Sequence, residues 1–462
     1  MAAATRVCYI RHMTIRTSAV LLAASTVFAG FVHAQDVSPE KLADAELQSL
    51  LTIYKDLHSH PELSTFEQRS AGIVAKELKA AGCEVTEKVG KYEIPGATCY
   101  GVVGVMKNGD GPVVLVRSDM DALPVHEETG APYASTVTTK NREGREVPVM
   151  HACGHDIHMT CLIGTARALS KLKDKWKGTI LFVGQPAEEV VTGAKAMMND
   201  GLYTRWPKPN YALALHDDSD TEAGKISVIE GYSHAAADSV DVTVKGAGGH
   251  GAYPHKTHDP IVLSAQIINA WQTIISREKN PLDRAVVTVG SIHGGTKHNI
   301  IPDEVKMQLT VRTYKPEVRQ AVLAALDRIA RGCATAAGIP ADRMPEVRLA
   351  GDGGTAATYN NPELVRRGAA ALKASLGDNN VITSDPEMVS EDFCVYSLPD
   401  NSIPAFMFNV GAVSPEKIAA SKKPGAAPLP TLHSSKFLPV ADKTIRTGVI
   451  GMTACVLDLL KK

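Results

Sequence analysis

Short runs of continuously apolar residues recur along the chain and alternate with stretches of helical periodicity. The runs are 113–116, 179–183, 211–215 and 405–410, and the helical stretches include 38–57, 65–81, 156–171 and 442–460. Continuous apolarity is typical of strands buried on both faces of a sheet, and intervening helices favour parallel pairing. The pattern therefore predicts an α/β fold whose mostly parallel, mixed sheet is flanked by helices.

From residue 233 the pattern changes to alternating strands and amphipathic helices. Asp259 and Pro260 have the residue types of a helix N-cap and first position, and they begin a helix that runs to Ile275. Expected elements are strand 239–244, this helix, strands 285–292 and 305–313, helix 317–337 and a strand near Val347. This βαββαβ order predicts a ferredoxin-like α+β unit, 233–347, inserted into a catalytic domain made of 35–232 and 348–462.

The N-terminal segment has the layout of a secretory signal. Arg6, Arg11 and Arg16 precede the uncharged run 19–32, and Val32-His33-Ala34 fits a small-x-small cleavage site. We expect residues 1–34 to be removed near Ala34 and the mature protein to be secreted or periplasmic. Met13 begins a complete signal by itself, so either methionine fits the role of initiator.

Composition narrows the function classes further. Removal of three arginines with the signal takes the formal net charge from −1 to −4, and no basic cluster points to nucleic acid. No later apolar run is long enough to span a bilayer. The remaining seven cysteines are odd in number and scattered, which is not a disulfide framework, although Cys83 and Cys99 could pair in an oxidising compartment.

A cysteine and three histidines fall within eight residues of the stretch MHACGHDIH: His151, Cys153, His155 and His158. Thiolate and neutral imidazole are good ligands for a borderline-soft divalent metal. The alternative is that Cys153 is a small buried residue and that the histidines decorate the start of a helix.

Further ligand-type residues follow the predicted buried strands. Asp119 and Asp121 come after the first strand, Glu188 and Glu189 after the second, and His216 after the third. Because ligands of parallel sheets gather at the carboxyl ends of strands, we expect these side chains to converge on a metal site.

The ordered motifs resemble those of the dimetal aminoacylase and carboxypeptidase family, in particular the amidohydrolase branch that contains hippurate hydrolases, N-acyl-amino-acid deacylases and plant auxin-conjugate hydrolases. The resemblance runs from LHSHPELS (57–64) to LHSSKF (432–437), nearly the whole mature chain. Between them RSDMDALP, HACGHDIH, QPAEE, GGHGAYPH, HNIIPD and SEDF stand in the family's order.

The resemblance implies a site with two divalent metal ions, zinc or manganese, with cobalt as a third candidate. Glu188 would be the general base, and the Cys153 thiolate would bridge the two ions. The implied metal ligands are Cys153, His155, Glu189, His216 and His433. One carboxylate that binds metal beside one that stays free suits hydrolysis of an amide by an activated water.

The resemblance also implies roles around the metals. His250 would stabilise the oxyanion, often in the site of a neighbouring subunit. Asn299 and Arg312 would hold the substrate carboxylate, and Asp121 would orient a ligand histidine. Glu391 and Gly411 would lie in the pocket wall.

Some positions depart from the family's pattern without removing a ligand. Val190-Val191 follow the glutamates where glycines are usual, Asp217-Asp218 follow His216, and Ser435 replaces a frequent proline. These departures bear on substrate choice rather than on the chemistry.

We therefore expect a homodimeric amidohydrolase or carboxypeptidase that cleaves N-acyl amino acids or short peptides with a free carboxylate, with residues 233–347 as lid and dimerisation domain. Two alternatives stay open. One is a cysteine hydrolase with Cys153 as nucleophile beside His155 or His158. The other is a protein that binds metal or solute without catalysis.

Overall fold

The computed structural model describes residues 1–10, 12, 37–93, 96–351 and 354–462. Of these residues, 1–10, 12 and 37 belong to one unit and those of Ser38–Lys462 to another. Most of the expected signal, residue 11 and residues 13–34, lies outside the described residues. Within the described ranges every helix and strand belongs to the second unit, and none of those helices has both the length and the apolarity needed to cross a bilayer.

The larger sheet has eight strands in the order β1-β2-β6-β3-β7-β18-β8-β17. The four central strands, β6, β3, β7 and β18, run parallel, and antiparallel pairs lie at β1-β2, β2-β6 and β18-β8. All four predicted buried strands are among these central ones, so the mostly parallel mixed sheet is confirmed. The bounds are β1 (Glu84–Val89), β2 (Gly101–Asn108), β3 (Val113–Asp119), β6 (Gly178–Gln185), β7 (Tyr211–Glu222), β8 (Ile226–Val228), β17 (Val381–Thr383) and β18 (Ala405–Val413).

The register brings the chemical residues to one edge. Asp119 at the end of β3 is opposite Gln185 at the end of β6, and His216 on β7 is opposite Asn409 on β18. Parallel strands all present their carboxyl ends on the same side. The residues that follow these strands therefore share one edge of the sheet.

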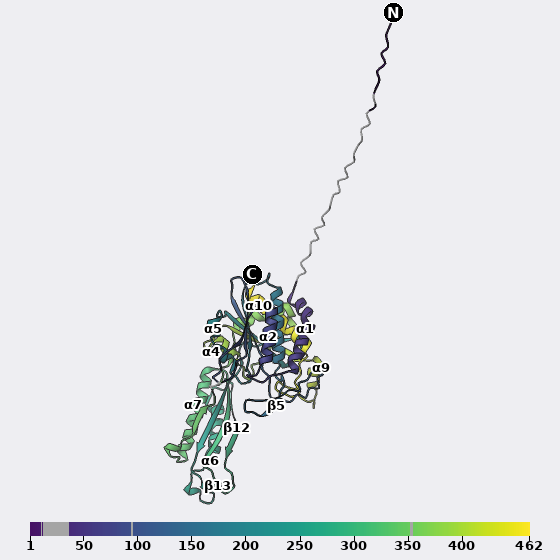
Figure 1. The fold of residues 1–462 in the computed structure, drawn as a ribbon. Coiled ribbons are helices and arrows are strands. Elements are labelled where there is room, and N and C mark those ends of the chain that lie inside the picture. Colours follow the sequence, from purple (N-terminus) through teal and green to yellow (C-terminus); the bar gives the residue numbers. More distant parts are fainter. Residues whose placement is uncertain (11, 13–36, 94–95, 352–353) are drawn as a thin grey trace. The chain divides into compact units, whose positions relative to one another are not determined.

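Helices cover both faces of this sheet (Figure 1). One face is covered by α2 (Gln68–Ala80), α3 (His155–Lys171), α8 (Pro362–Leu376) and α10 (Ala441–Leu460), and α1 (Pro39–Ser59) packs on α3 and α10. The other face is covered by α4 (Gly193–Asn199) and α5 (Leu202–Arg205), whose Met197 and Leu202 join a buried cluster with Leu115 and Leu181. The short helix α9 (Pro415–Ser421) follows β18. Ser38 caps α1 as its residue type favours, by accepting a hydrogen bond from the Lys41 N–H.

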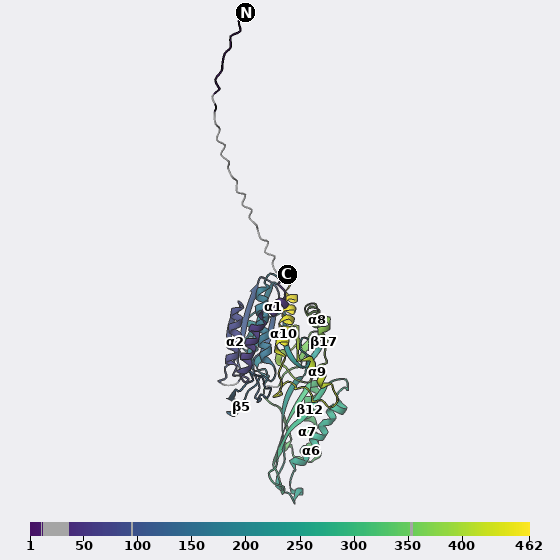
Figure 2. The same ribbon diagram turned by 90° about the vertical axis from the view of Figure 1, so that its right-hand side faces the viewer.

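A second sheet has four strands in the order β12-β14-β10-β15. Its strands are β10 (Ala236–Lys245), β12 (Ala285–Gly294), β14 (Glu304–Thr313) and β15 (Glu346–Leu349), and its helices are α6 (Pro260–Thr273) and α7 (Pro316–Ala336). The chain order is the predicted βαββαβ. In Figure 2, α6 and α7 lie side by side against this sheet. Alternate apolar residues of β10 and β14 pack under both helices, around the buried Trp271, whose indole N–H donates to the Leu326 carbonyl.

Smaller pairs complete the fold. They are β4 (Thr138–Lys140) with β5 (Glu146–Pro148), β9 (Gly231–His234) with β16 (Thr358–Asn360), and β11 (Gly249–His250) with β13 (Ile300–Ile301). Cys83 and Cys99, which an oxidising compartment would allow to pair, are both free and buried.

Candidate metal centre

Cysteine, histidine and glutamate side chains meet at the carboxyl edge of the central strands. The Sγ of Cys153 lies 3.6 Å from Nε2 of His216 and 3.2 Å from Nε2 of His433. Nε2 of His433 is 3.4 Å from Oε1 of Glu189, and Nε2 of His155 is 3.9 Å from the same oxygen. The five ligands that the resemblance implies therefore form one cluster, although they come from four separate segments of the chain.

The turn before α3 places Cys153 and His155 in this cluster. Gly154, between them, has φ +71°, a left-handed conformation that glycine adopts without strain. An added Cβ there would lie 2.2 Å from Oδ2 of Asp217. The backbone can approach that carboxylate only because position 154 has no side chain, and this approach turns both ligands toward the same space.

Asp121 holds the turn that carries Glu188 and Glu189. Its two carboxylate oxygens accept the N–H groups of Glu188 and Glu189 at 3.1 and 3.0 Å, and Ser64 Oγ donates to it at 2.7 Å. Oδ1 of Asp121 is also 3.4 Å from Nδ1 of His155. One carboxylate thus fixes two segments of the cluster, which is the contact expected of a residue that orients a ligand histidine.

The residues of the cluster would accept a cation. Nε2 of His155 and Oε1 of Glu189 are buried and have no hydrogen-bond partner among the described residues. Buried polar atoms are nearly always paired, so unpaired ligating atoms that converge indicate the place of an ion. Sulfur, nitrogen and carboxylate oxygen together suit zinc, manganese or cobalt.

The pKa values of Glu188, Glu189 and His155 are shifted by burial and by neighbouring charges. Burial, then the carboxylates of Glu391 and Glu189, raise the pKa of Glu188 well above its ordinary value. Burial raises the pKa of Glu189 to about 7, although His155 opposes this shift. Burial opposes protonation of His155, but Asp119, Asp121 and Glu189 together raise its pKa to about 10. Negative charge is in excess here, and a bound cation would relieve it.

His158, the third histidine of the motif, is taken up by other contacts. Its Nδ1 lies 2.6 Å from Oδ1 of Asp119, and its Nε2 lies 3.1 Å from Oδ1 of Asp217. His158 is three residues from His155, and the two rings lie 5.3 Å apart. His151 is buried, and burial lowers its pKa to about 4.

Arg117 is a buried residue whose contacts sequence reasoning did not predict. Its fully buried guanidinium donates to Asp119 at 2.7 Å, to Glu391 at 2.8 Å and to Asp392 at 3.2 Å. Its Nε donates to Oε1 of Gln185 at 2.9 Å. An arginine inside an otherwise apolar strand was the available signal, because a buried charge requires partners.

A cavity of about 810 Å³, the site cavity, opens beside the cluster. Cys153, Glu188, Glu189, His216 and His433 line it, together with Arg312 of β14 and Glu391. Glu188 is 7% exposed, and Arg312 is half-buried with Nη1 donating to the Val311 carbonyl. A candidate base and a candidate carboxylate-binding group therefore lie in one cavity.

Three other predicted residues lie elsewhere. His250 and Asn299 are exposed and adjacent: His250 pairs with Ile300, and the Asn299 carbonyl accepts the Gly251 N–H. Figure 1 shows β13 at the end of the inserted unit that is far from α1 and α10. Gly411 is buried where an added Cβ would lie 2.0 Å from the Glu222 carbonyl. None of these three lines the site cavity.

Residues 115–428, which include the Cys153–His155 turn, Glu188, Glu189 and His216, match the model of peptidase family M20/M25/M40. The chain belongs to this family. N-acetylcysteine deacetylase of Bacillus subtilis is 34% identical over 373 residues, 80% of this chain and 89% of that protein. Hippurate hydrolase of Campylobacter jejuni is 34% identical over 80% of this chain and 92% of that protein.

A solved structure of a dinuclear metal-binding peptidase of the M20 family from Bacillus subtilis is similar along almost its full length. The TM-score is 0.70 at 28% identity, and the match covers 89% of this chain and 98% of that one. This M20/M25/M40 member is therefore a hydrolase of the amidohydrolase and peptidase type.

The contacts of Arg117 lead to a stability prediction for the Arg117→Met variant. Removal of the guanidinium leaves the buried carboxylates of Asp119, Glu391 and Asp392 without their cation, so we expect a loss of about 3–5 kcal/mol in the free energy of unfolding. Urea unfolding followed by circular dichroism measures this loss. The control is Arg366→Met, which removes an exposed pair with Glu230 and should cost less than about 1 kcal/mol.

The same variant should show a pH dependence of known sign. Burial acts to raise the pKa of Asp119, but Arg117 and His155 hold it well below its ordinary value. A carboxylate with a lowered pKa stabilises the fold above its unfolded pKa and loses that contribution as pH falls. Because the unfolded pKa of an aspartate is about 3.9, the stability gap between parent and Arg117→Met should be larger at pH 6 than at pH 3. A gap that widens on acidification would contradict this account.

Proposed function

We propose that this hydrolase cleaves the amide bond of N-acyl amino acids or of short peptides with a free carboxylate, with two divalent metal ions and Glu188 as general base. The observation that carries the proposal is the convergence of Cys153, His155, Glu189, His216 and His433 beside a free carboxylate, that of Glu188, in the site cavity. The names of the two sequence relatives, a deacetylase of N-acetylcysteine and a hydrolase of hippurate, support the substrate class.

Those five residues would hold the two ions, with Cys153 as the bridge. When bound, a pair of divalent cations lowers the pKa of a water and polarises an amide carbonyl. Zinc and manganese are the first candidates and cobalt the third, because nitrogen, oxygen and sulfur ligands serve all three. The dinuclear metal-binding peptidase of similar fold supports the number of ions.

Glu188 would carry the proton. Asp121 accepts its backbone N–H, while its carboxylate faces the site cavity and has no side-chain partner of opposite charge in direct contact among the residues that the structure describes. The raised pKa of Glu188 favours uptake of a proton from water at a carboxylate oxygen and its later delivery to the leaving amine nitrogen. Glu189 turns toward the histidines, so the two neighbouring glutamates have separate tasks.

Arg312 would bind the substrate carboxylate. Its guanidinium presents several N–H donors, and a forked arrangement binds a carboxylate through two hydrogen bonds. Burial lowers its pKa, which remains high enough for a permanent positive charge. Asn299 lies beside His250 outside the site cavity, so it stays a second candidate only for the site of a partner subunit. Gly411 stays a prediction for the pocket wall.

Burial and the neighbouring carboxylates disfavour Cys153 as a nucleophile. Burial, then Glu189 and Glu188, raise the pKa of the Cys153 thiol well above its ordinary value, and a thiol in that state is a poor nucleophile. Burial lowers the pKa of both neighbouring histidines, His216 and His433. A cation would reverse the preference for the neutral thiol, which again favours Cys153 as a ligand.

We further propose that residues 233–347 form a lid and dimerisation domain and that the protein is a homodimer. His250 lies outside the site cavity of its own chain, so a role in catalysis requires the site of a partner subunit. Ile300, which pairs with His250, and Ile292 of β12 are both 48% exposed and offer apolar surface on this unit for such a contact. The proposed signal, residues 1–34, would deliver this enzyme to the periplasm or the exterior.

The metal requirement is tested by chelation. Purified protein should contain about two divalent ions per chain, and hydrolysis of hippurate, N-acetyl amino acids or a dipeptide should disappear with EDTA and return with zinc, manganese or cobalt. Inductively coupled plasma mass spectrometry and amine release measure the two quantities. Activity that survives full chelation but is lost on alkylation would overturn the metal mechanism and favour Cys153 as nucleophile.

The role of Glu188 is tested by Glu188→Gln. We expect kcat to fall by about 10²–10⁴-fold with unchanged metal content, because the amide cannot accept the proton. Glu189→Gln is the matched control, since it should lose metal as well as activity. Glu188→Gln that turns over at the parent rate would require another base, and a parent that binds metal but hydrolyses no substrate would favour the solute-binding alternative.

The role of His250 across subunits is tested by complementation. Coexpression of His250→Ala with Glu188→Gln, each inactive alone, should regain up to about a quarter of the parent activity, because half of the sites in each hybrid dimer contain both intact residues. Glu188→Gln coexpressed with Glu189→Gln should regain nothing. No gain in the first pair would contradict a contribution from the partner subunit.

A further inference from the structure

The loop 384–391, called the wall loop, forms one side of the site cavity. Glu387, Val389, Ser390 and Glu391 of this loop line that cavity. The loop follows β17 and leads into the 3₁₀ turn Asp392–Ser397. Its position therefore sets the width of the cavity where a substrate would lie.

Backbone contacts with β9 and with Ala235, which follows it, fix one side of the wall loop. The Glu387 N–H donates to the Ser233 carbonyl at 2.8 Å, and the Ala235 N–H donates to the Val389 carbonyl at 2.8 Å. At its end, the Glu391 carboxylate accepts from Arg117. None of these contacts uses the carbonyl of Pro386 or of Glu387.

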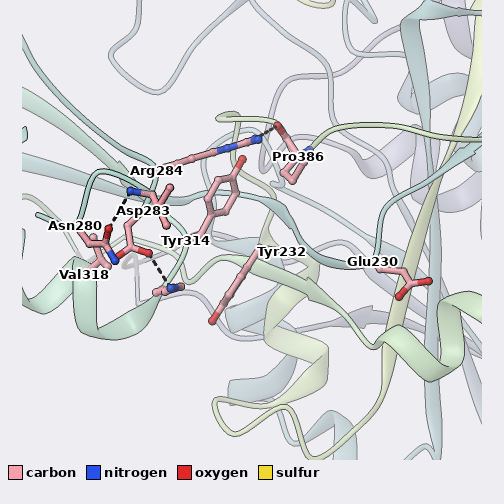
Figure 3. Close-up of a pocket in the computed structure, with 10 residues that line it drawn as sticks. Glu230, Tyr232, Asn280, Asp283, Arg284, Tyr314, Val318 and Pro386 are labelled. Carbon is pink, nitrogen blue, oxygen red and sulfur yellow. Dashed lines mark hydrogen bonds and ion pairs between the residues drawn. The ribbon is translucent and has the colours of Figure 1, made fainter.

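Both of these carbonyls accept hydrogen bonds from the inserted unit. Tyr314 Oη donates to the Glu387 carbonyl at 2.7 Å, and Arg284 Nη1 donates to the Pro386 carbonyl at 3.2 Å. Figure 3 shows the Arg284 side chain extended past the Tyr314 ring to Pro386. Consecutive carbonyls of the wall loop are thus held by two side chains of the other sheet.

Arg284 and Tyr314 adjoin the same end of the β12-β14 pair. Arg284 precedes β12 and Tyr314 follows β14, and the adjoining strand ends, Ala285 and Thr313, are directly paired. Asp283 and Lys315, the next residues outward, form an ion pair of 2.7 Å. The positions of both donors are therefore fixed by the same end of the β12-β14 pair.

The same strand end carries Arg312 into the site cavity. Arg312 is two residues before Tyr314 on the chain and lies opposite Val286 of β12. Glu387 contacts both the inserted unit and the site cavity. Its carbonyl accepts the hydrogen bond from Tyr314, and the residue lines the site cavity together with Arg312. A fixed distance between the β14 end and the wall loop therefore fixes the distance between Arg312 and the opposite wall.

We propose that Arg284 and Tyr314 are positioning residues that hold the wall loop at a set distance from Arg312 and so determine how tightly substrate binds. This inference rests on the proposed function, in which Arg312 binds the substrate carboxylate. The two residues surround a cavity of about 400 Å³ together with Tyr232, Asp283, Lys315 and Pro386 (Figure 3). They act through the backbone of the loop and do not line the site cavity themselves.

Tyr314→Phe and Arg284→Met remove one donor each and keep most of the side-chain volume. We expect KM for the best substrate to rise about three- to tenfold in each, the usual effect of one lost hydrogen bond, with kcat changed less than about twofold. The control is Tyr232→Phe, which removes a hydroxyl from the same cavity without touching a wall-loop carbonyl. In the double variant the two effects should combine less than multiplicatively, because both donors hold one loop.

Hydrogen exchange followed by mass spectrometry gives a readout without catalysis. Amides of 386–391 should exchange faster in Tyr314→Phe and Arg284→Met than in the parent and Tyr232→Phe. Unchanged exchange in both variants would show that Arg284 and Tyr314 do not hold the wall loop. Faster exchange with unchanged KM would show that the position of the loop does not affect substrate binding. A parent without amidohydrolase activity would instead contradict the proposed function, and the exchange experiment would still test whether Arg284 and Tyr314 hold the wall loop.

Discussion

Buried negative charge at the carboxyl edge of the central strands is the constraint on which the rest of this structure depends. Arg117 offsets part of it by pairing with Asp119, Glu391 and Asp392. His158 lies between Asp119 and Asp217 and offsets another part. What remains is concentrated around Glu188 and Glu189, where the structure has unpaired ligating atoms. Stability and chemistry are therefore linked, because the same carboxylates that require compensation in the fold also define where a cation would bind.

The central sheet could be predicted because its strands are buried on both faces. Continuous apolar runs such as 113–116 and 405–410 are shorter than an ordinary helix and rich in β-branched or aromatic residues, which favours strands, and both lie in the core as expected. The helix α6 could also be placed, since Asp259 accepts the N–H groups of Ile261 and Val262 as a cap should. Short or half-exposed strands such as β1 and β8 were missed because their burial depends on neighbours distant in sequence.

The cluster itself could be predicted in part. Cys153, Glu189 and His216 follow predicted strands or begin a predicted helix, so their convergence follows from the topology of a parallel sheet. The placement of His433 came from the motif alone, because it lies in a loop with φ +66° that no periodicity reveals. The Arg117 network could not be predicted, since Glu391 and Asp392 reach it from 274 and 275 residues away.

Gly154 limits how this chain can vary. Two separate conditions exclude a side chain there: the left-handed backbone, and the carboxylate of Asp217 only 2.2 Å from where a Cβ would be. A shorter residue at position 217 would remove the overlap but leave the backbone strain, and it would also take a partner from His158. A substitution at position 217 therefore does not allow a side chain at position 154. Together the two positions fix the backbone between Cys153 and His155.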